Sequence, residues 1–449
     1  MTSVMWFRRD LRLADNPALL SAASDATDAR VVPLFVLDPA LWRPAGPARR
    51  AYLTASLTDL GHRVGGLLLR RGDPVEEVVA VARAARATAV HIAADFGPYG
   101  RQRDHDVEAA LARHDIVLVR TGSPYAVAPG RVVNKNRDAY RMFTPYSRTW
   151  REHGWPAPPM PPRRVSWMRP LKSDDLDDAP TPGNLRLPAA GEWAAHRRWR
   201  EFIEQRLDSY GTTRDRADLD STSRMSAHLK WGEIHPRTLL ADLGRQRSEG
   251  AATYRTELAW REFFADFLWR SPGSAREYLK PRFARMEYDE PGGSFAAWRD
   301  GLTGYPIVDA GMRQLRSEGW VHNRIRMLAA SFLVKDLHVE WRHGARHFLR
   351  WLVDGDLSSN QHGWQWTAGC GTDPAPYFRI FNPTVQGKRF DPHGDYVRRY
   401  VPELRDVDAT SIHEPWTLDG GPPRGYPTPI VDHRAERQES LRRFEMLRA

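Results

Sequence analysis

The stretch VVPLFVL, residues 31–37, is a short apolar run of the kind that forms a buried β-strand. Similar runs occur at residues 4–7, 67–69, 89–93 and 116–119. Amphipathic helical stretches lie between them, at residues 49–65, 75–86 and 103–113. Strands that alternate with helices form a parallel sheet with helices on its faces. Residues 1–125 are therefore predicted to form a Rossmann-like, doubly wound α/β domain. No G-x-G-x-x-G follows the first strand, so a dinucleotide site is not expected there.

After this domain the pattern changes twice. The stretch WPAPPMPPRRVSWMRPLKSDDLDDAPTPG (155–183) is dense in Pro and Asp, which disfavours helix interiors. We predict a long irregular connector over residues 126–190. From residue 191 onward apolar residues recur every three or four positions, which indicates helices. Residues 191–449 are predicted to form one all-helical domain.

Composition narrows the class of protein. The 449-residue chain carries 66 basic and 56 acidic residues, a net charge of +10. A basic surface favours a polyanionic partner, although an Arg-rich coding bias is an equal alternative. The one cysteine, Cys370, excludes a disulfide framework and a cysteine-based metal site, and we expect no metal. Neither a signal peptide nor a membrane span is expected, and we predict a cytoplasmic, soluble monomer.

Two polar strings in the helical region stand out. STSRMS (221–226) precedes a helical stretch, where hydroxyls and free N–H groups suit a phosphate; simple helix capping is the alternative. TELAWREFF places Glu257, Trp260 and Arg261 on one helix face, as in a site for a planar ligand; an ordinary ion pair on an amphipathic helix is equally compatible.

Two further strings combine amides, acids and indoles. WVHNRIRM places Asn323 and Met327 four residues apart, with Arg326 beside them. DGDLSSNQHGWQW (354–366) supplies two carboxylates, an amide and two indoles, which suit the polar edge of a flavin ring. An Asx turn that caps a helix is the alternative for this segment. Together the strings indicate an aromatic, polar pocket in a basic helical domain.

The chain resembles the photolyase/cryptochrome family, and in particular the class I photolyases that repair cyclobutane pyrimidine dimers. The motifs that carry the resemblance occur in family order and are WFRRDLRLADNPAL (6–19), TSRMS, ELAWREFF, TGYPIVDAGMRQL, GWVHNRIRM, SFLVKDL, DGDLSSNQHGWQW and PYFRIFNPTVQGKRFD. The resemblance implies an α/β domain, a connector and a helical domain that binds folded-over FAD.

The resemblance also implies which residues hold FAD. Those at the phosphates and ribityl chain would be Tyr210, Thr222, Ser223, Arg224 and Ser226. Those around the rings would be Glu257, Trp260, Arg261, Trp320, Asn323, Arg326, Asp354, Asp356 and Asn360. Asn360 would face flavin N5, a feature that accompanies a stable, fully reduced flavin in the family.

The implied activity is light-driven repair of UV-damaged DNA. The dimer would be flipped out of the duplex into the pocket, as photolyases in general do with their target bases. Reduced FADH⁻ would then donate one electron to it. The implied catalytic residues are Glu257, Trp260, Asn323, Met327, Asn360 and Trp366. Photolyases that repair (6-4) lesions look as if they need His at the positions of Asn323 and Met327, where His acts as an acid. Neither Asn nor Met can act as an acid there, so the resemblance implies repair of cyclobutane dimers.

Three accessory roles follow from the same resemblance. Candidate DNA phosphate contacts are Arg214, Arg324, Arg379 and Lys388. An electron relay to the flavin would use Trp364 and Trp341, with Tyr288 at the outer position where relatives carry Trp, so we expect slower photoreduction. A second, antenna chromophore, a deazaflavin rather than a folate, would involve Phe35, Arg49 and Asp95. The rival interpretations are a cryptochrome-type light sensor without repair activity and a non-catalytic DNA-binding protein with a vestigial flavin site.

Overall fold

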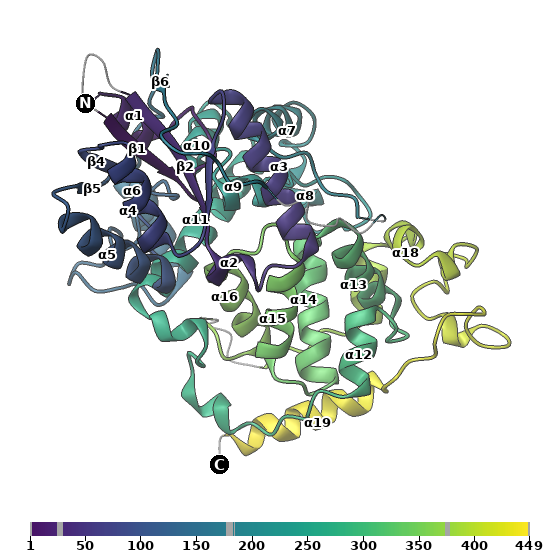
Figure 1. Cartoon of the computed structure of the whole chain (residues 1–449). Helices are drawn as coiled ribbons and strands as arrows, with labels where there is room; N and C mark the ends of the chain where they lie inside the picture. Colours follow the sequence, from purple (N-terminus) through teal and green to yellow (C-terminus); the bar gives the residue numbers. More distant parts are fainter. Residues whose placement is uncertain (1, 25–29, 177–182, 184, 373–377, 448–449) are drawn as a thin grey trace. The chain divides into compact units, whose positions relative to one another are not determined.

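The computed structural model describes residues 2–24, 30–176, 183, 185–372 and 378–447 (Figure 1). The chain forms two compact units, each built from several segments. The first unit contains Met1–Pro182, Leu187–Asp208 and Ser223–Pro272. The second contains Gly183–Arg186, Ser209–Thr222 and Gly273–Ala449.

A parallel sheet forms the centre of the first unit, with the strand order β3-β2-β1-β4-β5 and β6 pairing with β2. The strands are β1 (Thr2–Phe7), β2 (Arg30–Leu37), β3 (Leu68–Arg71), β4 (Ala89–Ile92), β5 (Val117–Arg120) and β6 (Ser166–Trp167). In the register, Val4 of β1 lies beside Val32 and Val90. The predicted parallel α/β sheet is confirmed, because apolar runs buried on both faces form such strands.

Helices flank this sheet and continue the first unit. They are α1 (Pro17–Ser24), α2 (Pro39–Trp42), α3 (Pro47–Arg63), α4 (Pro74–Ala84), α5 (Pro98–Ala112), α6 (Phe143–His153), α7 (Glu192–Gln205), α9 (Ser226–Trp231), α10 (Pro236–Gly244) and α11 (Glu249–Arg270). Several begin with a Pro behind a capping residue. Asp73, for example, accepts a hydrogen bond from the Val75 amide before α4.

The region expected to be an irregular connector contains the helix α6 and the short strand β6. On α6, Tyr146, Ser147 and Trp150 share one buried face, and α6 packs against α11. The surrounding Pro residues concealed this short amphipathic pattern. Residues 177–182 and 184 of the predicted connector lie outside the described residues. The boundaries 1–125, 126–190 and 191–449 stay predictions, and the compact units cross them, because α7 and α9–α11 group with the sheet.

The second unit is helical around an aromatic core that contains Trp298, Trp341 and Phe332. Its α-helices are α8 (Tyr210–Thr213), α12 (Gly293–Asp300), α13 (Pro306–Glu318), α14 (Asn323–Ser331), α15 (Trp341–Trp351), α16 (Leu357–Ala368), α17 (Pro383–Phe390), α18 (Asp395–Tyr400) and α19 (His433–Met446). Short 3₁₀ segments are η1 (Pro272–Ala275), η2 (Pro281–Arg285), η4 (Pro402–Leu404) and η5 (Pro415–Thr417), and a π-helical turn, η3 (Phe332–Asp336), continues α14. Among the described residues, no helix combines the length and apolar character that a bilayer span requires.

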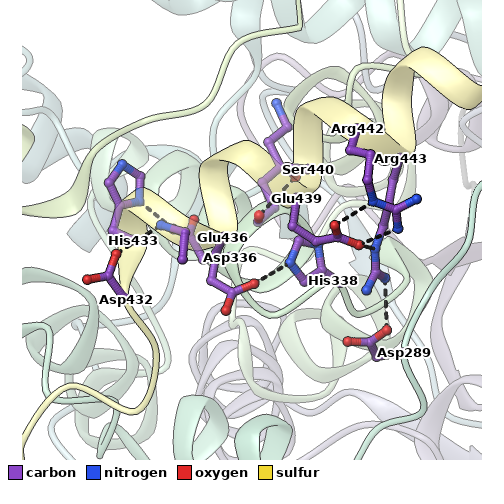
Figure 2. Close-up of polar contacts among 12 residues, drawn as sticks. Asp289, Asp336, His338, Asp432, His433, Glu436, Glu439, Ser440, Arg442 and Arg443 are labelled. Atoms are coloured by element: carbon purple, nitrogen blue, oxygen red, sulfur yellow. Dashed lines mark hydrogen bonds and ion pairs between the residues drawn. The ribbon is translucent and has the colours of Figure 1, made fainter.

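The last helix, α19, is tied to η3 by polar contacts (Figure 2). The buried Asp336 carboxylate contacts Nδ1 of His433 at 2.5 Å, and Ser440 donates to the Lys335 carbonyl at 2.9 Å. His338 and Glu436 form a third contact at 2.7 Å. Burial raises the pKa of Asp336, and the contact with His433 opposes that rise. These bonds fix the end of the segment that begins with α14.

One carboxylate, Glu262 on α11, anchors the start of the connector within the first unit. It accepts hydrogen bonds from the Ala126 amide at 2.5 Å, the Val127 amide at 3.0 Å and the Trp150 indole at 2.6 Å. The side chain is buried, and burial raises its pKa against the effect of these three donors. The same helix carries Glu257, Trp260 and Arg261, so this anchor also fixes their helix.

Replacing Glu262 tests this anchor. Glu262→Leu leaves three buried donors without an acceptor, and we expect the free energy of unfolding to fall by about 3 kcal/mol or more. Glu262→Gln keeps one acceptor oxygen and should cost less. Urea unfolding monitored by circular dichroism measures the loss. Glu249→Ala, an exposed site on the same helix, is the control and should cost less than about 1 kcal/mol; equal losses for the Leu variant and this control would contradict the assignment.

Candidate functional site

The helix α14 places Asn323, Arg326 and Met327 on one face, because they stand at positions i, i+3 and i+4. The helix begins at Asn323 because Nδ1 of His322 accepts a hydrogen bond from the Arg324 amide at 3.2 Å. The Asn323 amide nitrogen lies 3.9 Å from the Met327 sulfur. The structure thus brings together the amide and thioether that the sequence placed in one site.

An ion pair between a partly exposed arginine and a buried carboxylate joins α14 to the segment before α16. Nη2 of Arg326 contacts Oδ2 of Asp354 at 2.7 Å, and Nε of Arg326 donates to the Val321 carbonyl at 2.7 Å. The Asp354 side chain is only 1% exposed. Asp356 then caps α16 by accepting from the Ser359 amide at 3.1 Å. The Asx cap considered for this segment therefore exists, and it belongs to Asp356 and not to Asp354.

Two acceptor oxygens, one just before α16 and one on it, are available to a ligand. Oδ1 of Asp354 is buried without a hydrogen bond among the described residues. Asn360 donates its amide nitrogen to the Ala345 carbonyl at 3.1 Å and to Gln361 at 2.9 Å, which leaves its carbonyl oxygen for another donor. A buried acceptor without a donor is costly, so such a site suits a ligand with N–H groups. The flavin of FAD carries N–H groups on its pyrimidine edge and, when reduced, at N5, and the residues present fit it.

Indoles lie on the same helices. Trp364 is buried against α15, where a Cβ at Gly344 would collide with its ring, and Phe348 meets it edge-on at 5.0 Å. Trp341 begins α15 one turn before Gly344. Trp366 lies under the guanidinium of Arg379, 5.5 Å from ring centroid to Cζ. Trp320, also buried, lies edge-on to His322 at 6.4 Å.

In the first unit, α11 carries Glu257, Trp260 and Arg261. The Trp260 ring stacks on Phe143 of α6 with centroids 3.6 Å apart and an interplanar angle of 7°. Arg261 donates to the backbone carbonyls of Pro124 at 3.2 Å and Leu229 at 3.2 Å. Its guanidinium therefore joins three segments of the unit, a role that the sequence pattern did not predict.

The 221–226 string forms a tight turn before α9. Arg224 has φ +53°, in the left-handed region that non-glycine residues rarely adopt. The residue at the N-cap of α9 is Met225, which makes no side-chain cap, and the Ser223 hydroxyl accepts a hydrogen bond from the Met225 amide at 3.3 Å. Ser223 is 2.8 Å from the Tyr254 hydroxyl, and its carbonyl accepts from Arg198 at 2.9 Å. Tyr210 begins α8 in the second unit, and Thr222 ends that unit's segment.

Comparison with known proteins decides the family. The model described as the FAD binding domain of DNA photolyase matches residues 254–446, and the DNA photolyase model matches residues 3–163. A deoxyribodipyrimidine photo-lyase of Streptomyces griseus is 42% identical over 99% of both chains. This chain belongs to the DNA photolyase family.

Two solved structures of the family are similar over nearly the whole chain. A class III photolyase from Agrobacterium tumefaciens is 33% identical with a TM-score of 0.93, covering 100% of this chain and 98% of that one. A cryptochrome from Synechocystis sp. PCC6803 is 25% identical with a TM-score of 0.90, covering 98% of each. The expected photolyase/cryptochrome membership is confirmed, while the assignment to class I stays a prediction.

Four basic residues are expected to contact DNA in this photolyase-family chain. Arg324 contacts Asp215 at 2.7 Å, and Arg214 lies 4.0 Å from the same carboxylate. Lys388 is ion-paired with Glu414. The Arg379 guanidinium lies over Trp366. All four belong to the second unit.

A cavity in the first unit lies at the carboxyl ends of β1, β2 and β4, where ligands bind in open α/β sheets. Its space, counted to the open mouth, is about 860 Å³. The three expected antenna residues, Phe35, Arg49 and Asp95, line it together. Burial would raise the pKa of Asp95, but nearby guanidinium groups, chiefly that of Arg103, hold it below its usual value. Trp6, Trp42 and Trp231 add aromatic walls.

Sequence reasoning missed two features of the site. The first is the N-cap of α14, His322. The sequence carries no signal for this cap, because His is an uncommon N-cap residue. Tyr278 meets Trp341 edge-on at 6.1 Å, whereas Tyr288, the predicted outer relay residue, stacks on Tyr278. No spacing rule signals a contact between residues so far apart in the chain.

The His322 cap makes a testable prediction about α14. Burial lowers the pKa of His322 to about 4, so the unfolded chain, with a pKa near 6.5, binds more protons between these values. The stability that neutral His322 contributes is therefore lost as pH falls from about 6.5 to 4, by at most about 3 kcal/mol. His322→Asn, which keeps a capping oxygen, should make the fall in stability across this window shallower without abolishing it, because burial also lowers the pKa of His347 and of His362 to about 4. His322→Ala should cost about 1 kcal/mol near neutral pH. Urea unfolding at several pH values measures both effects; an unchanged pH profile in His322→Asn would exclude His322 as one of the titrating groups.

Proposed function

We propose that this chain is a deoxyribodipyrimidine photo-lyase, which uses light and reduced FAD to split cyclobutane pyrimidine dimers in DNA. The observation that carries the proposal is the α14–α16 site, with two open acceptors for a flavin beside the Asn323–Met327 pair. The full-length similarity to a photo-lyase of that name supports it. The site has no His at these two positions, which favours cyclobutane dimers over (6-4) lesions.

The residues proposed to hold FAD fall into two groups. The hydroxyls and backbone around Arg224, with Tyr210, would bind the phosphates and ribityl chain. Trp260, Arg261, Trp320 and the α14–α16 residues would surround the rings. When bound, reduced and excited by light, FAD supplies one electron to the dimer and takes it back after the ring has split.

The chain's own residues prepare this chemistry. The Asn360 carbonyl would accept the hydrogen bond of N5–H, which favours the reduced state. Arg326 holds one oxygen of Asp354, so the other oxygen keeps a fixed direction towards its ligand. Because the protein fixes these acceptors before the cofactor binds, little reorganisation accompanies electron transfer.

The proposed lesion pocket is lined by indoles and one carboxylate. Trp260 and Trp366 would pack against the two stacked pyrimidines, and each is already held by a neighbour, Phe143 or Arg379. Glu257 would bind the base edges of the dimer. Asn323 and Met327 complete the wall without a group that donates a proton to the lesion.

For the antenna, we propose a deazaflavin in the cavity that contains Phe35, Arg49 and Asp95. The aromatic walls of this cavity suit a planar ring system. The basic side chains of Arg8, Arg9 and Lys230 suit a ring system that carries an acidic group. A folate is the alternative occupant. Its glutamate tail would also meet the basic side chains.

A repair assay tests the proposed function. Fully reduced holoprotein, mixed with a thymine-dimer oligonucleotide under blue light, should restore the undamaged bases, and a dark control should not. Glu257→Ala should lower the repair rate per bound FAD, because the dimer loses its carboxylate partner, whereas Glu249→Ala on the same helix should not. Protein that binds FAD and changes redox state in light yet leaves the dimers intact would instead be a cryptochrome-type sensor.

Salt dependence tests the DNA contacts. Binding of dimer-containing duplex should weaken steeply with salt, and Arg379→Ala should reduce the slope of log K against log salt by about 1. Lys388→Ala should change the slope less, because Glu414 already neutralises that charge. Fluorescence anisotropy at several salt concentrations provides the slopes, with Arg245→Ala, ion-paired on the first unit, as control. Identical slopes for Arg379→Ala and the unmodified protein would remove Arg379 from the interface.

A further inference from the structure

The outer end of the electron relay is a tyrosine–carboxylate pair. We propose that Tyr278, with Glu340 as the acceptor of its proton, is the terminal electron donor to Trp341 during photoreduction of the oxidised flavin. The inference rests on the proposed function, because it requires bound FAD and the relay through Trp364 and Trp341. It replaces Tyr288 at the position where the sequence alone put it.

Ring contacts select Tyr278. Its ring centroid lies 6.1 Å from that of Trp341 at an angle of 84°, which is an ordinary edge-to-face contact. Among the described residues, Tyr288 makes its ring contact with Tyr278 and not with Trp341, at 6.5 Å and 17°. An electron that leaves Tyr288 for Trp341 would therefore pass Tyr278 first.

Tyr278 also has a base in place. Its hydroxyl donates to Oε1 of Glu340 at 2.5 Å, and Arg342 holds the same oxygen at 2.7 Å. Burial raises the pKa of Tyr278 well above its usual value, and the neighbouring Tyr288 and Glu340 raise it further, so the resting phenol keeps its proton. An oxidised phenol is a strong acid, and here the proton has a carboxylate within hydrogen-bond distance.

Trp341 has the opposite surroundings. Its side chain is fully buried, and its Nε1–H has no hydrogen-bond partner among the described residues. An oxidised Trp341 therefore has no adjacent base to take its proton, and it stays a strong oxidant. Tyr278, which meets the Trp341 ring edge-on, can supply an electron, and its hydrogen bond to Glu340 provides an acceptor for the proton.

Trp364 would give one electron to the bound, photoexcited oxidised flavin and regain one from Trp341, and the Trp341 radical cation would regain one from Tyr278. The O–H bond of Tyr278 breaks and its proton passes to the Glu340 carboxylate. The products are a neutral tyrosyl radical, a Glu340 carboxylic acid and two restored indoles, with one electron stored on the flavin. An added thiol can later reduce the tyrosyl radical.

Transient absorption of the oxidised holoprotein after a blue flash tests the proposal. The unmodified protein should show a tyrosyl radical that grows as the tryptophan radical decays, and D₂O should slow this growth. Tyr278→Phe should lose the tyrosyl signal and prolong the tryptophan radical, and Glu340→Gln should slow tyrosyl formation. Tyr288→Phe, the matched control on the stacked ring, should keep the signal. FAD content and circular dichroism establish that each variant is folded and loaded.

The outcomes separate the inference from the function on which it rests. A tyrosyl signal kept in Tyr278→Phe, lost in Tyr288→Phe, or missing from the unmodified holoprotein would overturn the role of Tyr278. Repair of thymine dimers by chemically reduced protein does not involve the relay. If the reduced protein repairs dimers while the Tyr278 results are negative, the proposed function stands and only the role of Tyr278 is wrong. If the reduced protein does not repair dimers, the proposed function is wrong, whatever the radical measurements show.

Discussion

The ion pair between Arg326 and the buried carboxylate of Asp354 is the contact on which the site depends. A carboxylate at this depth is tolerated only when it is paired, and the pair here joins α14 to the segment that leads into α16. Because Arg326 occupies one oxygen, the other is left as a directed acceptor. Asn360 on the following helix offers a second acceptor in the same way. The protein thus holds a polar surface that suits a ligand with hydrogen-bond donors, such as the N–H groups of a flavin.

The rest of the second unit protects and extends that surface. Its large aromatic side chains fill the core between α12, α14, α15 and α16, where Trp364 packs on Phe348 and on α15, and Trp341 at the start of α15 meets Tyr278. At the far end of α14 the chain is held by α19 through Asp336 and Lys335. The aromatic residues that stabilise the fold therefore include those of the proposed electron relay.

Sequence reasoning predicted what local patterns encode. Apolar runs such as 31–37 gave the parallel strands, and the i, i+3, i+4 spacing of Asn323, Arg326 and Met327 correctly placed them on one helix face. It failed where tertiary contacts decide. Arg261 binds carbonyls of distant segments, α6 forms within a Pro-rich region because α11 buries its face, and Tyr278 meets Trp341 through folding alone. The family resemblance of the motifs indicated which roles the residues have. Which side chains they contact could be learned only from the folded structure.

The central claim is that an electron passes from the light-excited, reduced flavin to a thymine dimer held in the indole-lined pocket. The most direct measurement is the fluorescence lifetime of the reduced flavin in the holoprotein, with saturating dimer-containing oligonucleotide and with an undamaged oligonucleotide of the same sequence. The account predicts a shorter lifetime with the dimer alone, because electron transfer competes with emission only there. Equal lifetimes with both oligonucleotides, under conditions where the damaged one is bound, would contradict it.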